Sequence, residues 1–421
     1  MNIMDELAWR GAVNQQTDEQ GLYDYVENHD ITLYCGVDPT GDSLHIGHLI
    51  PFMVLKRFQL AGHHPVIVIG GLTGSIGDPS GKSEERQLQS MEQVQHNAEK
   101  LTAMMNKLFI DRDQTGDFQI VNNYDWTHQL TLIDFLRDYG KLFNVNTMLN
   151  KDIVASRLEV GISYTEFTYQ ILQAMDFLHL YQEKNVRLQI GGADQWGNIT
   201  GGLELIRKVE GPDAKAFGMT IPLLLKSDGT KFGKTAGGAV WLDPEKTSPY
   251  EFYQFWINQQ DSDVIRYLKY FTFFSKEEIE ALAKKVETEP EKRTAQKALA
   301  TEMTLFVHGE EGLKDAQTIT DALFSGEIKA LNAKQIEQGF GKMPGETISQ
   351  EQKDIVSWLV EYGVDKSKRQ AREDVNNGAI YLNGERVTDL DYQVGAKDAI
   401  DGRYIVVRRG KKKYFLMTVE D

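Results

Sequence analysis

Apolar residues in the first half of the chain alternate between short continuous runs and longer segments with helical spacing. Residues 31–37 and 65–69 are β-rich runs, and the second is apolar throughout, as expected of a strand buried on both faces of a parallel sheet. Residues 44–60 between them have helical spacing, and runs at 186–190 and 219–225 repeat the strand pattern. Strands that end near glycines and lead into helices predict an open α/β sheet, in which ligands bind at the carboxyl ends of the strands.

The pattern becomes helical from residue 248 onward. Residues 248–251 and 275–278 are Ser-x-x-Glu capping boxes, which predict helix starts, and a further helix is expected over 291–307. Residues 326–352 contain Gly341, Pro344 and Gly345 and are predicted to be an irregular linker. The tail has two helix-like pieces followed by short strands. The expected domains are an α/β domain over 1–225, a helical domain over 226–325 that begins with a lysine-bearing loop, the linker over 326–352, and a small α+β domain over 353–421.

Composition and charge narrow the class of protein. The 421 residues are 41% hydrophobic and 26% charged, which is ordinary for a globular chain, and no apolar run reaches membrane-spanning length. Asp5 and Glu6 speak against a secretory signal, and the lone Cys35 excludes a disulfide framework or a cysteine-based zinc site. We expect a soluble, cytoplasmic protein without a membrane segment.

The charge is distributed unevenly along the chain. The net charge of -16 argues against binding nucleic acid through bulk charge, but residues 353–421 hold thirteen basic and twelve acidic side chains. The tail is therefore close to neutral beside a strongly acidic body.

A glycine-rich loop follows the second strand run, at residues 70–83. It is neither a Walker loop nor a dinucleotide fingerprint, because only three residues separate Gly77 from Gly81 and G-x-G-x-x-G is absent. A plain mobile turn remains an equal interpretation. Lys82 and Arg86 beside the loop are candidate phosphate ligands.

Two short motifs suggest phosphate chemistry. His45-Ile46-Gly47-His48 lies where a loop enters a helix, and a helix N-terminus favours anions. Surface histidines or a two-histidine metal site are the alternatives, and the lack of a third ligand disfavours metal. Lys231-Phe232-Gly233-Lys234-Thr235 places two lysines three apart to hold a leaving pyrophosphate, with a solvated basic turn as the alternative.

Taken together, these two motifs resemble the HIGH and KMSKS signatures of class I aminoacyl-tRNA synthetases, in the same order and separation. Phe232-Gly233 replaces Met-Ser, and Thr235 replaces the last Ser, a version similar to that of bacterial tyrosyl-tRNA synthetases. Residues 34–40, residues 191–198 and the tail are also similar to that family, over nearly the full chain. The resemblance implies a Rossmann-like parallel-sheet catalytic domain, an α-helical domain and a small RNA-binding domain. It also implies a tyrosine–tRNA ligase that is a homodimer through an insertion near residues 120–185.

A set of polar residues near position 170 also suits a tyrosine substrate, independently of this resemblance. Tyr169, Gln173 and Asp176 are spaced i, i+4 and i+7, so they share one helix face, although an ordinary polar stripe would look the same. The resemblance pairs Tyr34 with Asp176 at the substrate phenol. It assigns Tyr169, Gln173 and Asp78 to the ammonium group, and Asp38 and Gln195 to orienting the substrate.

The resemblance also implies an ATP site. It places His45 and Thr40 at the terminal phosphates and His48 near the ribose. Further ATP contacts are implied at Cys35, Gly36, Gly47, Gly192, Asp194 and Lys234, and pyrophosphate contacts at Lys82, Arg86, Lys231, Lys234 and Thr235. Mg²⁺ is expected with ATP, without a dedicated carboxylate cage or metal-ligand set, and no tightly bound cofactor is expected.

The tail is similar to a small RNA-binding domain shared with a ribosomal protein. Its basic residues are candidate contacts to tRNA phosphates, with a solvated basic face as the alternative. These residues are Lys368, Arg369, Arg372, Arg408, Arg409, Lys411, Lys412 and Lys413.

Three rival functions remain at this point. A tryptophan ligase is disfavoured by the pair of Tyr34 and Asp176, and a nucleotidylyltransferase is disfavoured by the second motif and the tail. A paralogue that only binds RNA is disfavoured by the intact histidines and lysines of the two motifs.

Overall fold

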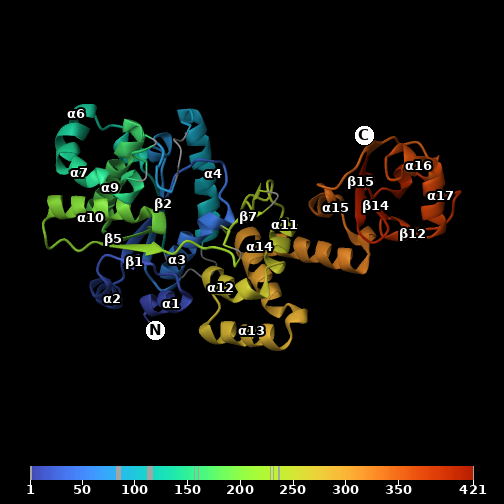
Figure 1. Cartoon of the computed structure of the whole chain (residues 1–421), viewed down its shortest axis with the longest axis horizontal. Coiled ribbons are helices and arrows are strands. Elements are labelled where there is room, and N and C mark those ends of the chain that lie inside the picture. The colour runs from blue at the N-terminus through green and yellow to red at the C-terminus, as the bar shows by residue number, and fades with distance from the viewer. Residues whose placement is uncertain are drawn as a thin grey trace. The chain divides into compact units, whose positions relative to one another are not determined.

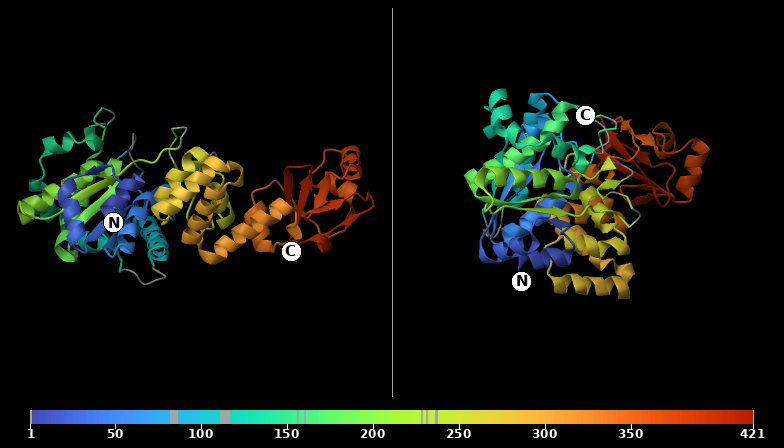
Figure 2. Two further views of the ribbon diagram at one scale, coloured as in Figure 1. Left: turned by 90° about the horizontal axis from the view of Figure 1, so that it is seen from below. Right: turned by 60° about the vertical axis from the view of Figure 1, so that its left-hand side comes forward.

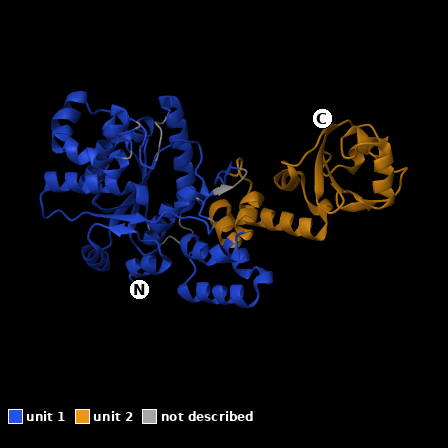
Figure 3. Ribbon diagram, in the orientation of Figure 1, with its two compact units in different colours: residues 1–243, 259–299 blue, residues 244–258, 300–421 orange. Residues whose placement is uncertain are grey.

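The computed structural model describes residues 2–81, 87–110, 117–155, 157–159, 161–227, 229–230, 232–235 and 238–420. The chain divides into two compact units (Figure 3). Unit 1 comprises residues 1–243 and 259–299, and unit 2 comprises residues 244–258 and 300–421. Within the described ranges, no helix is long and apolar enough to cross a membrane.

The core of unit 1 is a sheet with the strand order β1-β6-β5-β2-β3-β4. The strands pair in parallel, except that β1 is antiparallel to β6. This confirms the predicted α/β class with a parallel sheet. The strands are β1 (Gln15–Gln16), β2 (Thr32–Val37), β3 (His64–Ile69), β4 (Gln119–Asn122), β5 (Val186–Gly192) and β6 (Phe217–Ile221).

Helices cover both faces of this sheet (Figures 1 and 2). Helices α3 (Leu49–Leu60) and α4 (Met91–Phe109) follow β2 and β3 on one face, and α9 (Tyr164–Lys184) and α10 (Trp196–Glu210) pack on the other. The chain runs outward from β2 to β4 and then returns to β5, so the order reverses between β2 and β5. Ligands of open α/β sheets bind at this reversal, beyond the carboxyl ends of the strands.

Shorter helices complete unit 1. They are α1 (Ile3–Arg10), α2 (Glu19–Asn28), α5 (Tyr124–Thr127), α6 (Leu132–Asp134), α7 (Val145–Leu149), α8 (Asp152–Ala155), α12 (Asp261–Phe271) and α13 (Lys276–Thr288). The capping box at Ser275 opens α13 as predicted. Residues 259–299 therefore belong to unit 1, whereas the sequence pattern had suggested that the α/β domain ends at residue 225.

Unit 2 combines helices with a small, mostly antiparallel sheet of strand order β12-β11-β14-β15-β9. Its helices are α11 (Pro249–Ile257), opened by the predicted capping box at Ser248, the later part of α14 (Thr294–Ser325), α15 (Ala333–Phe340), α16 (Ile355–Glu361) and α17 (Lys368–Asn376). The strands are β9 (Thr347–Ile348), β11 (Ile380–Leu382), β12 (Glu385–Val387), β14 (Tyr404–Arg409) and β15 (Lys413–Val419), with β10 (Lys353–Asp354) and β13 (Gln393–Val394) forming a separate pair.

Residues 326–352 do not form the irregular linker that the glycines and proline suggested. Helix α15 lies within them, capped by a reciprocal Asn332–Gln335 box, and it buries Ile336 and Phe340 against the sheet. β9 then pairs in parallel with β15. The sheet therefore begins before residue 353, because apolar residues at helical spacing outweigh isolated helix breakers. Gly309, whose φ of 73° lies outside the helical region, divides α14 into two helices, in agreement with a predicted helix that ends at residue 307.

Two buried arginines join three helices of unit 1. Arg57 of α3 donates from Nη2 to the carbonyls of Lys269, Tyr270 and Thr272 at 3.2, 3.1 and 2.6 Å. Arg10 of α1 donates to the Lys269 carbonyl at 3.0 Å. The last carbonyls of α12 have no partners within the helix, so these guanidinium groups satisfy them. Burial, followed by the nearby Arg10 charge, lowers the pKa of Arg57 to about 9.

Replacing Arg57 should destabilise unit 1. We expect Arg57→Leu to lower the free energy of unfolding by roughly 1–3 kcal/mol, because the Tyr270 carbonyl loses this donor while Arg10 still serves Lys269. Urea unfolding followed by tryptophan fluorescence measures the change. Arg207→Leu, at an exposed position of α10, is the matched control and should stay within about 0.5 kcal/mol of the parent. Equal midpoints for the two variants would contradict this role of Arg57.

Candidate functional site

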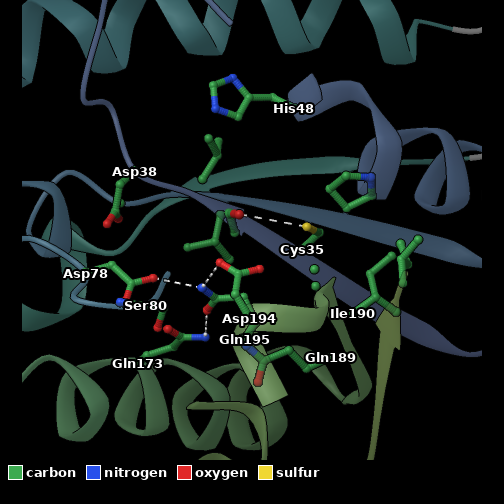
Figure 4. A pocket seen from close by; sticks show the side chains of 18 of the residues that line it. Cys35, Asp38, His48, Asp78, Ser80, Gln173, Gln189, Ile190, Asp194 and Gln195 are labelled. Carbon is green, nitrogen blue, oxygen red and sulfur yellow. Dashed lines mark hydrogen bonds between the residues drawn. The ribbon is translucent and has the colours of Figure 1, made fainter. Parts of the chain in front are cut away.

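A cavity of about 550 Å³ opens at the reversal between β2 and β5 (Figure 4). Its walls come from the ends of these two strands, the glycine-rich loop after β3, helix α9 and the start of the helical segment after β5. The predicted site residues that line it are Tyr34, Cys35, Gly36, Asp38, Thr40, Gly47, His48, Asp78, Tyr169, Gln173, Asp176, Gly192, Asp194 and Gln195. Residues separated by up to 161 positions in sequence are thus brought to one cavity, because parallel strands end at the same edge.

A buried carboxylate and a buried phenol lie at one end of this cavity. Tyr34 is 2% exposed and Asp176 is 6% exposed. The Tyr34 hydroxyl has no hydrogen-bond partner within the described chain. Burial raises the pKa of Asp176 to about 7, although Asn123 Nδ2 and Trp126 Nε1 each donate to its carboxylate at 2.9 Å. An unsatisfied buried hydroxyl beside a carboxylate is a site for a ligand group that both donates and accepts.

The carboxylate belongs to a continuous hydrogen-bond network. The Tyr169 hydroxyl donates to Asp38 Oδ2 at 2.8 Å, and Thr73 Oγ1 donates to Asp38 Oδ1 at 2.7 Å. Asn123 Nδ2 donates to Thr73 Oγ1 at 2.9 Å as well as to Asp176. A Cβ atom on Gly70 would lie 2.0 Å from Asp38 Oδ1, so this position requires glycine. The network fixes the orientations of the side chains around the cavity.

A second polar group surrounds Gln195. Its Nε2 donates to Asp78 Oδ2 at 2.8 Å, and Gln173 Nε2 donates to Gln195 Oε1 at 3.2 Å (Figure 4). The Oε1 atoms of Gln173 and Gln189 are buried and have no partner in the described part of the molecule. Carboxylates and unsatisfied amide oxygens suit a cationic group that donates several hydrogen bonds.

The two histidines of the first motif are held by backbone donors. The Gly47 amide donates to His45 Nδ1 at 3.0 Å, and the His45 amide donates to His48 Nδ1 at 3.3 Å, with the two rings stacked 3.8 Å apart. Because each Nδ1 accepts, the proton of the neutral imidazole lies on Nε2. The turn at Ile46–His48 is a 3₁₀ helix that precedes α3, so the helix begins later than residue 44.

The second motif lies directly against the first. Phe232 is buried, with its ring 4.9 Å from that of Tyr267 and 5.1 Å from that of Phe271. Gly233 has a φ of 91°, and a Cβ there would lie 3.2 Å from the Gly47 amide nitrogen. The two motifs therefore meet at the level of the backbone.

The side chains of several predicted ligands lie outside the described part of the structure. Lys82, Arg86 and Lys231 lie outside the described residues, and only the backbone of Lys234 and Thr235 is described, as strand β7 (Lys234–Thr235). Burial raises the pKa of Cys35 to about 12, so this side chain faces the cavity as a neutral thiol. Among the described residues, no group of three or more His, Cys, Asp or Glu side chains is placed to hold a metal ion.

The sequence patterns did not single out four polar residues of the site. Thr73, Asn123 and Trp126 orient the carboxylates, and Gln189 contributes an unsatisfied oxygen. Asn123 directly follows the end of β4. The rule that site residues follow the ends of parallel strands could therefore have predicted it.

The basic residues of the tail have different surroundings. Lys368, Arg369, Arg372, Lys411, Lys412 and Lys413 are exposed. Arg409 instead forms ion pairs with Asp365 at 2.9 Å and Asp374 at 2.7 Å, and donates to the Val364 carbonyl. This placement disfavours the predicted tRNA contact at Arg409, because its donors are directed into the domain.

Comparisons with known proteins agree with this geometry. Residues 26–325 match the family model of class I tRNA synthetases (W and Y), and residues 335–417 match a tyrosine–tRNA ligase C-terminal domain. The chain is 68% identical to tyrosine–tRNA ligase 2 of Bacillus cereus over 99% of both chains, and 65% identical to tyrosine–tRNA ligase of Lactiplantibacillus plantarum over 100% of both. A C-terminally truncated mitochondrial tyrosyl-tRNA synthetase of Aspergillus nidulans is similar in structure, with a TM-score of 0.69 and 30% identity over 77% of this chain and 94% of that one. The chain therefore belongs to the tyrosyl-tRNA synthetase family of the class I aminoacyl-tRNA synthetases.

Proposed function

We propose that this protein is a tyrosine–tRNA ligase, which activates L-tyrosine with ATP and transfers it to the 3′ end of tRNA(Tyr). The unsatisfied Tyr34 hydroxyl beside the Asp176 carboxylate carries this assignment. A substrate phenol can donate to Asp176 and accept from Tyr34 at once. The indole of tryptophan has only a donor, so it would leave the Tyr34 hydroxyl without a partner.

The other polar groups fit the rest of the substrates. Asp78, Gln173 and Tyr169 surround the position for the substrate ammonium, and Asp38 and Gln195 orient it. His48, Gly47 and Gly192 line the part of the cavity assigned to ATP, together with Thr40, Cys35, Gly36 and Asp194. Mg²⁺ would arrive with the ATP phosphates.

The chemistry requires positioning rather than a general base. The ionised carboxylate of tyrosine attacks the α-phosphorus of ATP, a new P–O bond forms, and the bond to the β-phosphate oxygen breaks as pyrophosphate leaves. A hydroxyl of the terminal tRNA ribose then attacks the activated carbonyl, its proton passes to the departing phosphate, and AMP leaves. Neutral histidines that donate from Nε2 and the lysines of the second motif stabilise charge on the transferring group.

The remaining partners follow from the surfaces of the two units. The predicted insertion carries exposed apolar side chains at Leu132, Ile133 and Val145, which are 72%, 67% and 58% exposed, and we propose that they form a homodimer interface. The basic tail would contact tRNA. Because the tRNA substrate serves translation, we place the reaction in the cytoplasm.

The proposed activity is tested by ATP–pyrophosphate exchange with each of the twenty amino acids. We expect exchange with tyrosine alone, and we expect Tyr34→Phe to reduce the preference for tyrosine over phenylalanine, because the pocket then loses one of its two phenol partners. Exchange driven best by tryptophan would contradict the assignment.

The first motif should act mainly on the rate of activation. His45→Ala and His48→Ala should each raise the activation barrier by about 2–4 kcal/mol with little change in tyrosine affinity, because a preorganised donor to the transition state is lost. Single-turnover adenylate formation measures the rate. His96→Ala, at an exposed position of α4, is the control. Unchanged rates in both motif variants would refute their role.

Tyrosine affinity should depend on the ionisation of Asp176. Its raised pKa of about 7 means that the carboxyl is protonated below neutrality, so affinity should fall as the pH drops through about 7. Trp126→Phe removes a donor that stabilises the carboxylate and should move this inflection to higher pH. Equilibrium dialysis on both sides of neutrality measures the effect, with Trp9→Phe as the control. An inflection that does not move in Trp126→Phe would argue against Asp176 as its origin.

The oligomeric state can be checked by sedimentation. Ile133→Glu should convert a dimer to monomers, because a charge would have to be buried in the interface. Ile110→Glu, at another exposed apolar residue of unit 1, should remain dimeric. A monomeric parent chain would overturn the proposed interface.

A further inference from the structure

Basic and aromatic residues alternate across four strands of the unit 2 sheet. Arg386 of β12 lies opposite Tyr381 of β11, Tyr381 lies opposite Arg408 of β14, and Arg408 lies opposite Tyr414 of β15. Residues directly opposite one another in antiparallel strands point to the same face. These four side chains, here called the cross-strand row, therefore form one line on one face of the sheet.

The two faces of this sheet have different environments. One face carries Ile380 and Val407 and packs on α16 and α17, which lie on that side in Figure 1. The other face carries Val406 and Leu416 and packs on the end of α14 and on α15. The cross-strand row lies on this second face, next to its apolar core. Tyr414 is where the row meets that core, because its ring lies 5.6 Å from the ring of Phe340 on α15. Arg386 is exposed, and Tyr381, Arg408 and Tyr414 are half-buried.

Arg408 is held by stacking on a ring, and Arg386 is held by hydrogen bonds to the backbone. The guanidinium carbon of Arg408 lies 3.7 Å from the centroid of the Tyr381 ring, and Arg408 Nε has no hydrogen-bond partner within the described residues. Arg386 donates from Nε to the Gly378 carbonyl at 2.8 Å and from Nη2 to the Asn377 carbonyl at 3.0 Å. The stacked guanidinium plane of Arg408 presents a flat surface and a fork of donors, the combination that binds bases and phosphates.

The charge around the row is complementary to RNA. One further pair, Arg409 with Lys413, separates Arg408 and Tyr414 from the turn that joins β14 to β15, and this turn contributes exposed Lys411 and Lys412. Glu385, the acidic neighbour on β12, is paired with Lys329. Arg409 points to the opposite face, into its ion pairs with Asp365 and Asp374, so it does not extend this surface.

We propose that the cross-strand row is an RNA-binding site that stacks an unpaired base of tRNA and holds its flanking phosphate. The proposal deepens the proposed function, because it rests on the tail contacting tRNA. It adds Tyr381, Arg386 and Tyr414 to the contact surface and places that surface on the sheet face opposite α17.

Variants of the full-length chain test the proposal. Arg408→Gln should weaken tRNA binding about tenfold and lower the slope of log affinity against log salt by about 0.7–0.9, since one phosphate contact is lost. Tyr381→Leu should also weaken binding, and Tyr381→Phe should restore it, because a ring is enough to support the guanidinium. Filter binding of tRNA at several salt concentrations gives both quantities.

Two controls separate this site from other effects. Lys397→Gln removes a cation that lies over Tyr392, outside the row, and should leave the salt slope unchanged. Arg409→Gln should lower the thermal midpoint of unit 2 without lowering the salt slope, because it breaks internal ion pairs. An Arg408→Gln slope equal to that of the parent would overturn the proposal.

A third set of variants separates failure of the row from failure of the tail. Gln in place of Lys368, Arg369 and Arg372 removes the exposed charge of α17. If only this triple variant weakens binding, the RNA lies on the α17 side and the row is wrong. If neither set weakens binding, the role of the tail in tRNA recognition fails as well.

Discussion

The cavity depends on keeping one carboxylate buried. Asp176 lies on α9 among apolar residues of the sheet core, and ionising it there is unfavourable, as its raised pKa shows. Two donors, Asn123 and Trp126, offset part of that cost. Both donors come from the segment after β4. The phenol pocket therefore forms only where the sheet, α9 and this segment meet.

The same network links the phenol end to the rest of the site. Asn123 also holds Thr73, Thr73 holds Asp38, and Asp38 holds Tyr169. Each side chain of this network is therefore oriented by a hydrogen bond to a neighbour that is itself held in place. Such a site is preorganised, which reduces the reorganisation needed when the substrates react.

A second constraint is the packing of the two motifs. Gly233 lies so close to Gly47 that a side chain would crowd the backbone, and Phe232 is enclosed by Tyr267 and Phe271 of α12. The C-terminal carbonyls of α12 are in turn bound by Arg57 of α3, the helix that follows the first motif. Phe-Gly in place of Met-Ser is therefore consistent with an aromatic enclosure and a close backbone approach.

The sequence by itself determined the α/β class, the helix starts at Ser248 and Ser275, and the two motifs, because each depends on periodicity, capping or spacing within a short segment. It also placed Tyr169, Gln173 and Asp176 on one helix face. Only the tertiary structure decided that Asn123 and Trp126 hold Asp176, that residues 326–352 form part of a folded unit, and that the neighbours Arg408 and Arg409 have opposite surroundings. These outcomes depend on contacts between segments distant in sequence and on strand register, in which a shift of one residue reverses the face to which a side chain points.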